Sequence, residues 1–412
     1  MFDIHIYLSI LILFFQKIRL ANILPTSSVI ILAYPFLRTC LEFLSINSLS
    51  LETKALLFNT YIIEIFIFLV LIFLFKKYIK INPKYFSSNL SLNRFDLLFI
   101  IISLLASAFL SFIFSNSGAS GDIRNQVYRG LGPIRYLFTT LNFITLYGCI
   151  NKLSKFGKDN DQSFKPNLYW LILSASGLIG IFSGSKKGLL VLLPLIAFYF
   201  INNFNFNRLR KAFISKKLII TSTLFSVIVV PTLIIVRLRT TDLADTLWIL
   251  QKRIQYSAGY NFFLDRFIVN NGITKENPFQ ENVFSFITYY FSRSDISMNI
   301  GNNLKSLALN KDVIGGPVAN SIKSYFLISS QDPFSFSMFL FCLNHILFLL
   351  CIGYVVKFSA LKDSFIMNGI TLSLSTFLFT SFYDAYVLYS VITPILFVYF
   401  GYVLILQPKK LS

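Results

Sequence analysis

Long apolar runs alternate with short polar segments along most of the chain. A helix needs about 20 apolar residues to cross a bilayer, and fewer where charged residues at its ends reach back to the interface. About eleven runs meet this requirement, namely Ile4–Phe15, Ile23–Leu37, Leu57–Phe75, Leu97–Phe114, Ile134–Ile150, Leu168–Phe182, Leu189–Ile201, Leu218–Val236, Phe336–Val356, Phe365–Phe379 and Ala385–Leu406. The pattern predicts an all-α polytopic membrane protein with about eleven transmembrane helices.

The first run, Ile4–Phe15, is short for a membrane span. It fits either an interfacial helix or half of a longer, broken helix. No small-residue cleavage site follows it, so we do not interpret it as a removable signal peptide.

Composition excludes a soluble protein. The 412 residues are 55% hydrophobic and only 13% charged, whereas soluble domains average about 25% charged. The four cysteines, Cys40, Cys149, Cys342 and Cys351, lie in or beside apolar runs, with neither metal-ligand spacing nor a paired pattern. We therefore expect no metal and no cofactor.

The net charge of +19 bears on orientation in the membrane more than on nucleic acid, which we do not expect as a partner. The strongly basic loops Lys76–Arg94, Lys152–Lys165 and Arg208–Lys217 are each separated from the next by two predicted spans, so they share a side. Lys17 with Arg19, Lys357 with Lys362, and Lys409 with Lys410 fall on that side too. The positive-inside rule makes this side cytoplasmic, which places the C-terminus inside and the N-terminus outside.

The order of spans and loops divides the chain into three parts. Residues 1–236 carry the first eight predicted helices, 237–335 form one large extracytoplasmic loop, and 336–412 carry the last three helices and a short cytoplasmic tail. Within the large loop, Leu247–Val269 and Val283–Phe291 are typical of amphipathic helices on a membrane surface.

The outer face is rich in cations near membrane level. Arginine presents a planar fork of donors that suits phosphate, and lysine brings a compact charge. The candidates for binding a diphosphate or glycan are Arg124, Arg129, Lys186, Lys187, Arg237, Arg239 and Arg293. The alternatives are snorkelling lysines at a short turn, anchored helix ends and a solvated loop.

Acidic residues beside arginines in the large loop supply candidates for a general base, namely Asp242, Asp245 and Asp295. Simple surface ion pairs, which would also include Asp265, are the alternative. Glu64 lies within a predicted span, where it fits a buried structural partner or a catalytic group equally well. His345 is more typical of a packed, hydrogen-bonded histidine.

Several of these residues occur in a familiar arrangement. The outer turn Gly184-Ser185-Lys186-Lys187-Gly188, the arginines Arg124 and Arg129 in one outer loop and Arg237, Arg239 and Arg293 in another, and the stretch Ile314-Gly315-Gly316-Pro317 resemble the Wzy-type O-antigen (oligosaccharide repeat-unit) polymerases. In that family arginine usually follows the Gly-Ser pair, where this chain has lysine.

The resemblance implies a GT-C-like glycosyltransferase in the bacterial cytoplasmic membrane. Such an enzyme transfers a growing glycan from undecaprenyl diphosphate to a new lipid-linked repeat unit on the outer face, with neither nucleotide sugar nor metal. A chain-length regulator is a further partner that the resemblance suggests. The expected product is an O-antigen or a related surface polysaccharide.

Two other functions fit the same layout. An O-antigen ligase typically uses a histidine with arginines in its large outer loop, and no histidine lies between Arg237 and Ser335. A lipid-linked oligosaccharide flippase usually carries internal repeats, which we do not find, and rarely such a long outer loop.

Overall fold

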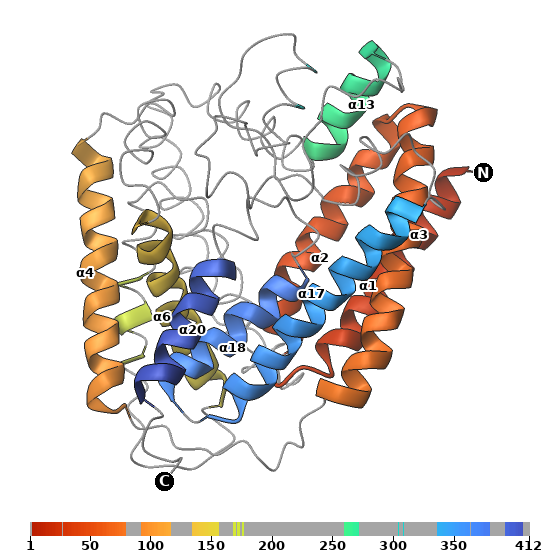
Figure 1. Ribbon diagram of the computed structural model, residues 1–412. Coiled ribbons are helices and arrows are strands. Elements are labelled where there is room, and N and C mark those ends of the chain that lie inside the picture. Colours follow the sequence, from red (N-terminus) through yellow and green to blue (C-terminus); the bar gives the residue numbers. More distant parts are fainter. Residues whose placement is uncertain are drawn as a thin grey trace, which may run out of the picture.

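Figure 1 presents a computed structural model of the chain. The structure describes residues 2–26, 28–79, 92–116, 134–155, 259–271, 336–362, 364–379 and 392–406, with isolated positions at 168–169, 171–173, 175–176, 304 and 308. The elements among these residues are all helices. The described part of the chain is therefore all-α, as the sequence predicts.

Four helices are long and apolar enough to cross a membrane: Asp3–Ala21, Leu51–Ile79, Arg94–Ile113 and Met338–Ala360. They belong to α1 (Phe2–Ala21), to α3 (Leu51–Leu74) with its π-helical continuation η2 (Phe75–Ile79), to α4 (Arg94–Asn116) and to α17 (Phe336–Ala360). The apolar runs thus fold as membrane-type helices.

The remaining helices complete the bundle. They are α2 (Ser28–Ser45), which a 3₁₀ turn η1 (Ile46–Ser48) links to α3, then α6 (Ile134–Lys155), α13 (Gly259–Asn271), α18 (Phe365–Leu378) and α20 (Thr393–Leu406). Figure 1 shows α1, α2 and α3 on one side and α4, α6 and α20 on the other, with α17 and α18 between them.

The first helix is longer than its apolar run predicts. It spans 20 residues, because it continues through Gln16, Lys17 and Arg19 beyond Phe15. Gln16 is buried, and the Lys17 ammonium lies 5.8 Å from the centroid of the Phe68 ring on α3. Packing therefore keeps polar residues inside the helix where hydropathy alone would end it.

Two contacts show which ends of the long helices lie together. The Asp3 carboxylate at the start of α1 pairs with the Lys54 ammonium at the start of α3 at 2.9 Å. Near the ends of the helices, the Lys357 ammonium of α17 donates to the Tyr78 carbonyl of η2 at 2.8 Å. Helices α1, α3 and α17 therefore run parallel.

The ends of the other helices join the end where α3 and α17 stop. Asp96, near the start of α4, interacts with the backbone amides of Phe365 and Ile366 at the start of α18, and with Lys152 near the end of α6. The basic residues gathered at this lysine-rich end include Lys76, Lys77, Arg94, Lys152, Lys357 and Lys362. The contacts thus bring to one end the described ends of two of the three basic loops that the charge pattern predicts to share a side; the third, Arg208–Lys217, lies outside the described residues.

Lys17 departs from that grouping. The sequence assigns it to the basic side, but it lies level with Phe68, eight residues before Lys76 on the adjacent helix. At 1.5 Å per residue this is about 12 Å short of the lysine-rich end. Lys17 is therefore a partly buried cation inside the bundle.

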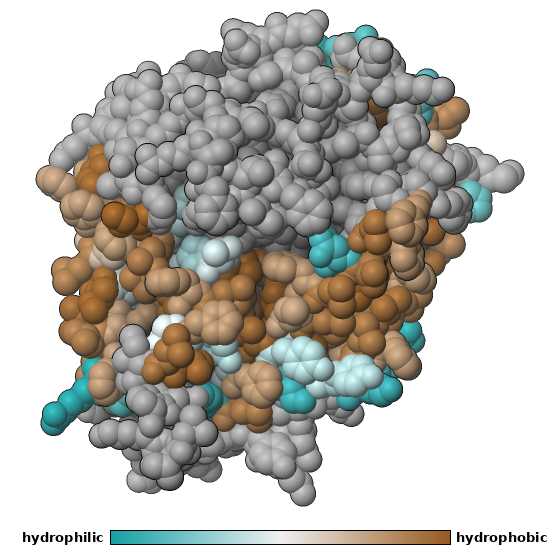
Figure 2. Space-filling model, viewed as in Figure 1, coloured by the Kyte–Doolittle hydropathy of each residue, from teal (hydrophilic) through white to brown (hydrophobic). Residues whose placement is uncertain are grey.

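Apolar side chains cover the outside of the bundle as well as its core. Large hydrophobic residues such as Phe66, Phe73, Leu105 and Phe112 are more than half exposed. Figure 2 shows a brown belt of hydrophobic residues across the visible face, with teal residues at its lower edge. Helices that are apolar on all sides suit lipid surroundings.

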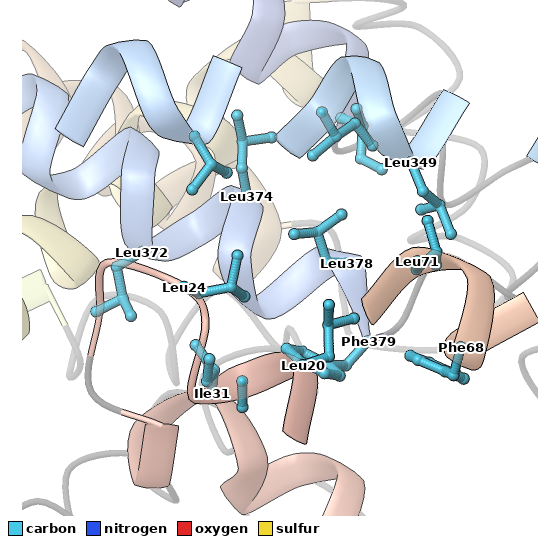
Figure 3. Close-up of a cluster of buried hydrophobic side chains, with 14 of the residues drawn as sticks. Leu20, Leu24, Ile31, Phe68, Leu71, Leu349, Leu372, Leu374, Leu378 and Phe379 are labelled. Atoms are coloured by element: carbon cyan, nitrogen blue, oxygen red, sulfur yellow. The ribbon is translucent and has the colours of Figure 1, made fainter. Parts of the chain in front are cut away.

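The core joins both sides of the bundle. In Figure 3, Leu20 and Leu24 of α1 and its turn face Leu374 and Leu378 of α18, with Leu71 of α3 beside them. Helices α6 and α18 approach closely at two glycines: a Cβ atom at Gly369 would collide with the Ile144 backbone, and one at Gly148 would lie 2.9 Å from the Phe365 ring. Small residues that let helix backbones approach are typical of membrane helix packing.

Candidate functional site

The predicted substrate-binding and general-base residues lie outside the described residues. They are Arg124, Arg129, Lys186, Lys187, Arg237, Arg239, Arg293, Asp242, Asp245 and Asp295. Their roles remain predictions. The structure does describe one helix of the large loop and the bundle on which it sits.

Helix α13 is that helix, and its sequence is amphipathic. Phe263, Leu264, Phe267 and Ile268 are buried, whereas Arg266 is exposed. The helix packs against α2 and α3, over the end of the bundle away from the lysine-rich end (Figure 1). The sequence predicts an amphipathic helix here but places it on the membrane surface. In the structure its apolar face packs against protein instead.

One carboxylate fixes α13 to the bundle. The Asp265 Oδ1 atom accepts a hydrogen bond from the backbone N–H of Ser50 at 2.7 Å. Ser50 is the N-cap of α3, and its hydroxyl accepts from the Thr53 amide. A carboxylate is favoured at a helix N-terminus because the amide dipoles point toward it. Asp265 therefore binds the backbone, and a simple surface ion pair does not describe its role.

Polar contacts continue around this end, which we call the docking end. Besides the Asp3–Lys54 pair, the Tyr7 hydroxyl donates to the Asn47 side-chain oxygen at 2.8 Å. These contacts tie α1, the turn η1 and α3 together beneath α13. The docking end is therefore an ordered platform on which part of the large loop rests.

Ionisable residues also lie deep inside the bundle. Glu64 on α3 is 3% exposed and His345 on α17 is 8% exposed. One turn before Glu64, the Tyr61 hydroxyl donates to Glu42 Oε2 on α2 at 3.2 Å. His345 is packed, as the sequence suggests. Glu64 is buried among helices, so it is a group of the protein interior and does not face lipid.

The end of α18 approaches this interior layer. Phe379, the C-cap of α18, stacks on Phe68 with 6.3 Å between ring centroids, and Lys17 lies over the same Phe68 ring. Helix α18 has 14 residues and so is about 21 Å long, less than the roughly 30 Å of a bilayer core. It starts at the lysine-rich end and stops inside the bundle.

A second polar cluster holds the lysine-rich end. Asn93 and Asp96 form a reciprocal cap of α4, with the Asp96 amide donating to Asn93 Oδ1 at 2.7 Å and the Asn93 amide donating to Asp96 Oδ2 at 3.3 Å. Lys152 is 1% exposed and interacts electrostatically with Asp96. The sequence treats Lys152 as a loop lysine. The Asn-x-x-Asp spacing before an apolar run is the signal that predicts the cap.

Neutral polar groups link α18 to α6 and to α17. The Asn151 amide of α6 donates to Asn368 Oδ1 at 3.1 Å, and the hydroxyls of Ser359 on α17 and Thr371 on α18 lie 2.8 Å apart. In the connection between α17 and α18, partial burial lowers the pKa of Lys362 from its usual value by desolvation. This region holds helices together through neutral polar contacts.

No group of metal-binding side chains occurs among the described residues, and all four cysteines are free thiols. The structure therefore neither pairs cysteines nor builds a metal centre in the described ranges. No family model matches the chain, and neither a curated protein nor a solved structure matches it.

Proposed function

We propose that this protein polymerises undecaprenyl-diphosphate-linked oligosaccharide repeat units on the outer face of a bacterial cytoplasmic membrane. It does so as a GT-C-like glycosyltransferase with about eleven transmembrane helices. The product is an O-antigen or a related surface polysaccharide. The sequence resemblance is the starting point of this proposal.

One structural observation supports it best. Helix α13 of the large loop is fixed to the docking end through Asp265 and Ser50, away from the lysine-rich end. If the lysine-rich end is cytoplasmic, as the positive-inside rule requires, the large loop lies outside together with the N-terminus, and the C-terminus lies inside. An enzyme whose two substrates are both displayed on the outer face needs its binding loop on that side.

The chemistry assigns a role to each group of predicted residues. The donor sugar is already activated, because its leaving group is a lipid diphosphate. Arg124, Arg129, Lys186, Lys187, Arg237, Arg239 and Arg293 would hold the diphosphate and stabilise the charge that develops on it. One of Asp242, Asp245 and Asp295 would accept the proton of the acceptor hydroxyl.

A second candidate function, transport of a lipid-linked oligosaccharide, is favoured by the short helix α18. Transporters often bind their substrates where discontinuous helices end near the bilayer midplane. Helix α18 ends inside the bundle beside Phe68 and Lys17. Polymerisation remains our proposal, because the large loop and its cations have no evident role in a flippase.

A gel of surface glycan from a deletion strain and from its complemented parent tests the function. Loss of the polymer ladder, with single repeat units still attached to their usual acceptor, is expected for a polymerase. Loss of all attached units, with long polymer accumulating on the lipid carrier, would identify a ligase. An unchanged ladder would exclude both and favour transport.

Complementation with variants tests the proposed site. Alanine at Arg237, at Arg239 or at the Lys186-Lys187 pair is expected to abolish polymer and leave the protein in the membrane. Each change removes a positively charged side chain that would stabilise the negative charge on the leaving diphosphate. Alanine at the exposed Lys77 of the lysine-rich end is the matched control. Full-length polymer from all of the Arg237, Arg239 and Lys186-Lys187 variants would contradict the electrostatic site.

A further inference from the structure

We propose that the ends of α3 and α17 form a binding surface for an anionic phospholipid of the surrounding bilayer. The lipid phosphate lies against Lys76 and Lys77, and the acyl chains lie along the apolar outer faces of the two helices. This inference does not depend on the proposed polymerase activity, because the surface is at the lysine-rich end, whereas helix α13 of the large loop packs at the docking end.

Packing and one hydrogen bond join the ends of α3 and α17. Gly353 of α17 lies against η2, because a Cβ atom added there would collide with the Ile79 side chain and lie 2.7 Å from the Phe75 ring. One turn further along α17, the Lys357 ammonium donates to the Tyr78 carbonyl at 2.8 Å. The two helix ends are therefore neighbours, and residues next to these contacts lie at similar depths.

The turn η2 places two lysines at the end of an apolar stripe on α3. Phe66, Leu69 and Phe73 form this stripe at helical spacing, and all three are exposed. Lys77 follows Phe73 by four residues, so it continues the same face, and Lys76 lies beside it. Both lysines are exposed. Cations that end an apolar helix face reach the depth of the lipid headgroups.

Helix α17 presents a matching apolar face. Leu347, Tyr354 and Phe358 are exposed on it at spacings of seven and four residues. Tyr354 follows Gly353, which contacts η2, so it lies near the level of the exposed Tyr78. Tyrosines of this kind are typical of a membrane interface, and Figure 2 shows polar residues along the lower edge of the apolar belt. Two adjacent apolar faces therefore end at one polar border.

The charge of this border is not balanced by the described chain. Lys357 donates to a carbonyl, and the Lys77 ammonium lies 5.2 Å from the centroid of the Tyr78 ring, which is neutral. Neither Lys76 nor Lys77 pairs with a carboxylate in the part of the chain that the structure describes. The described acid at this end, Asp96, is buried and interacts with backbone amides of α18. Lysines beside a membrane helix attract anionic headgroups.

The apolar faces favour a lipid over a soluble anion. Free phosphate would meet exposed lysines whose attraction is weakened by salt. The bilayer instead holds a phospholipid at this depth, so its phosphate is concentrated at the lysines, while its chains cover the stripes of α3 and α17. A zwitterionic phospholipid offers the same chains without net charge. The surface should therefore prefer anionic phospholipids.

Thermal unfolding of the full-length protein in a neutral detergent tests this preference. Added phosphatidylglycerol is expected to raise the unfolding temperature more than phosphatidylcholine, because a ligand that binds the folded state stabilises it. In Lys76→Gln, Lys77→Gln the concentration for half-maximal stabilisation should rise roughly 30-fold, about fivefold for each lysine. Equal stabilisation by the two lipids, or an unchanged concentration in the double variant, would overturn the proposal.

A second double variant separates a local surface from net charge. Arg94→Gln, Arg266→Gln removes the same charge from exposed positions on α4 and α13 and should keep the wild-type response to phosphatidylglycerol. A loss equal to that of the lysine variant would show that only net charge matters. Inorganic phosphate should not replace the lipid, and a stabilisation of the same size with phosphate alone would also contradict a lipid site.

Photolabelling of the unaltered protein does not depend on how the variants fold. A phosphatidylglycerol with a photoreactive group in its acyl chain would be incorporated into phosphatidylcholine bilayers that contain the protein. Mass spectrometry is expected to find more label on the exposed residues Phe73 of α3 and Phe358 of α17 than on Leu105 and Phe112 of α4. Equal labelling of the three helices would mean that the lipid has no preferred place, and the proposal would fail.

Discussion

The two sides of the bundle bury polar groups of different kinds. The side built from α1, α2 and α3 carries the ionisable groups Lys17 and Glu64 at mid-depth. The part built from α4, α6 and the adjoining central helix α18 has its buried charged groups, Asp96 and Lys152, at the lysine-rich end. Its described interior holds hydroxyls and amides between closely approaching helices.

This difference separates two uses of polarity in a membrane protein. Neutral hydrogen bonds and small residues hold helices together at little electrostatic cost. Ionisable groups at mid-depth are expensive and are therefore expected where they are used. The α6–α18 contact thus serves packing, and the layer around Glu64 is the place to look for function within the described bundle.

The largest expected effect concerns Asp96 and Lys152 at the lysine-rich end, and it tests how much these two buried charged residues stabilise the protein. Lys152→Met removes a buried ammonium that interacts electrostatically with Asp96, and the loss of the contacts of this cation should destabilise the protein by about 3 kcal/mol. Thermal unfolding in detergent would measure the loss against Lys77→Met, which removes an exposed lysine. The double variant Asp96→Asn, Lys152→Met should recover part of it. A single variant as stable as the parent would show that the pair contributes no stability.

The next effect tests the close helix contact. Gly369→Ala places a Cβ atom against the Ile144 backbone, which cannot move aside as a side chain can, so we expect a loss of about 1–3 kcal/mol from overpacking. Gly401 has open space around its Cβ position, which makes Gly401→Ala the matched control. Equal unfolding temperatures for the two variants would contradict the close approach of α6 and α18.

A smaller effect is expected where the large loop meets the α1–α3 side. Asp265→Ala removes the acceptor of the Ser50 amide and should weaken the docking of α13 by about 1–2 kcal/mol. Hydrogen–deuterium exchange at Ser50 should become faster, and polymer yield should fall. Asn270→Ala, an exposed change on the same helix, is the control. Unchanged exchange at Ser50 would mean that Asp265 does not hold the helix.

The smallest effect concerns His345, which borders the Glu64 layer. His345→Ala is expected to leave polymer length nearly unchanged, because this histidine is packed in the core. The glycan gel measures this directly. A well-expressed variant without polymer would make His345 a functional residue and would extend the ionisable layer to α17.

Much of the fold follows from apolar runs and charge. The pattern predicts helices where α3, α4, α6 and α17 lie, and the basic segments around them gather at one end. Hydropathy placed the end of α1 too early, because Gln16 and Lys17 are polar yet packed within the helix. The hydropathy pattern also did not predict that α13 packs on protein, because an amphipathic helix has the same pattern whether its apolar face meets a membrane or other helices.

For the candidate site, too, the sequence predicted some of the residues, and the structure was needed to find the contacts of others. The cations and acids expected to act on a lipid diphosphate were predicted from residue type and loop position, and no contact among the described residues tests them. The roles of Asp265 and Lys152 could not be read from the chain. Their partners, Ser50 and Asp96, are far away in sequence, and the identity of a charged residue does not reveal whether it meets a helix end, an opposite charge or water.

The sequence by itself determined that this is an all-helical membrane protein and which of its basic segments share a side. Those properties depend on local apolarity and on the distribution of charge along the chain, and both are sums over neighbouring residues. Only the tertiary structure decided that Lys17 lies over the Phe68 ring, that Asp265 holds α13 on α3, and that α18 stops inside the bundle. These depend on how separate helices are placed against each other, which one helix cannot encode alone.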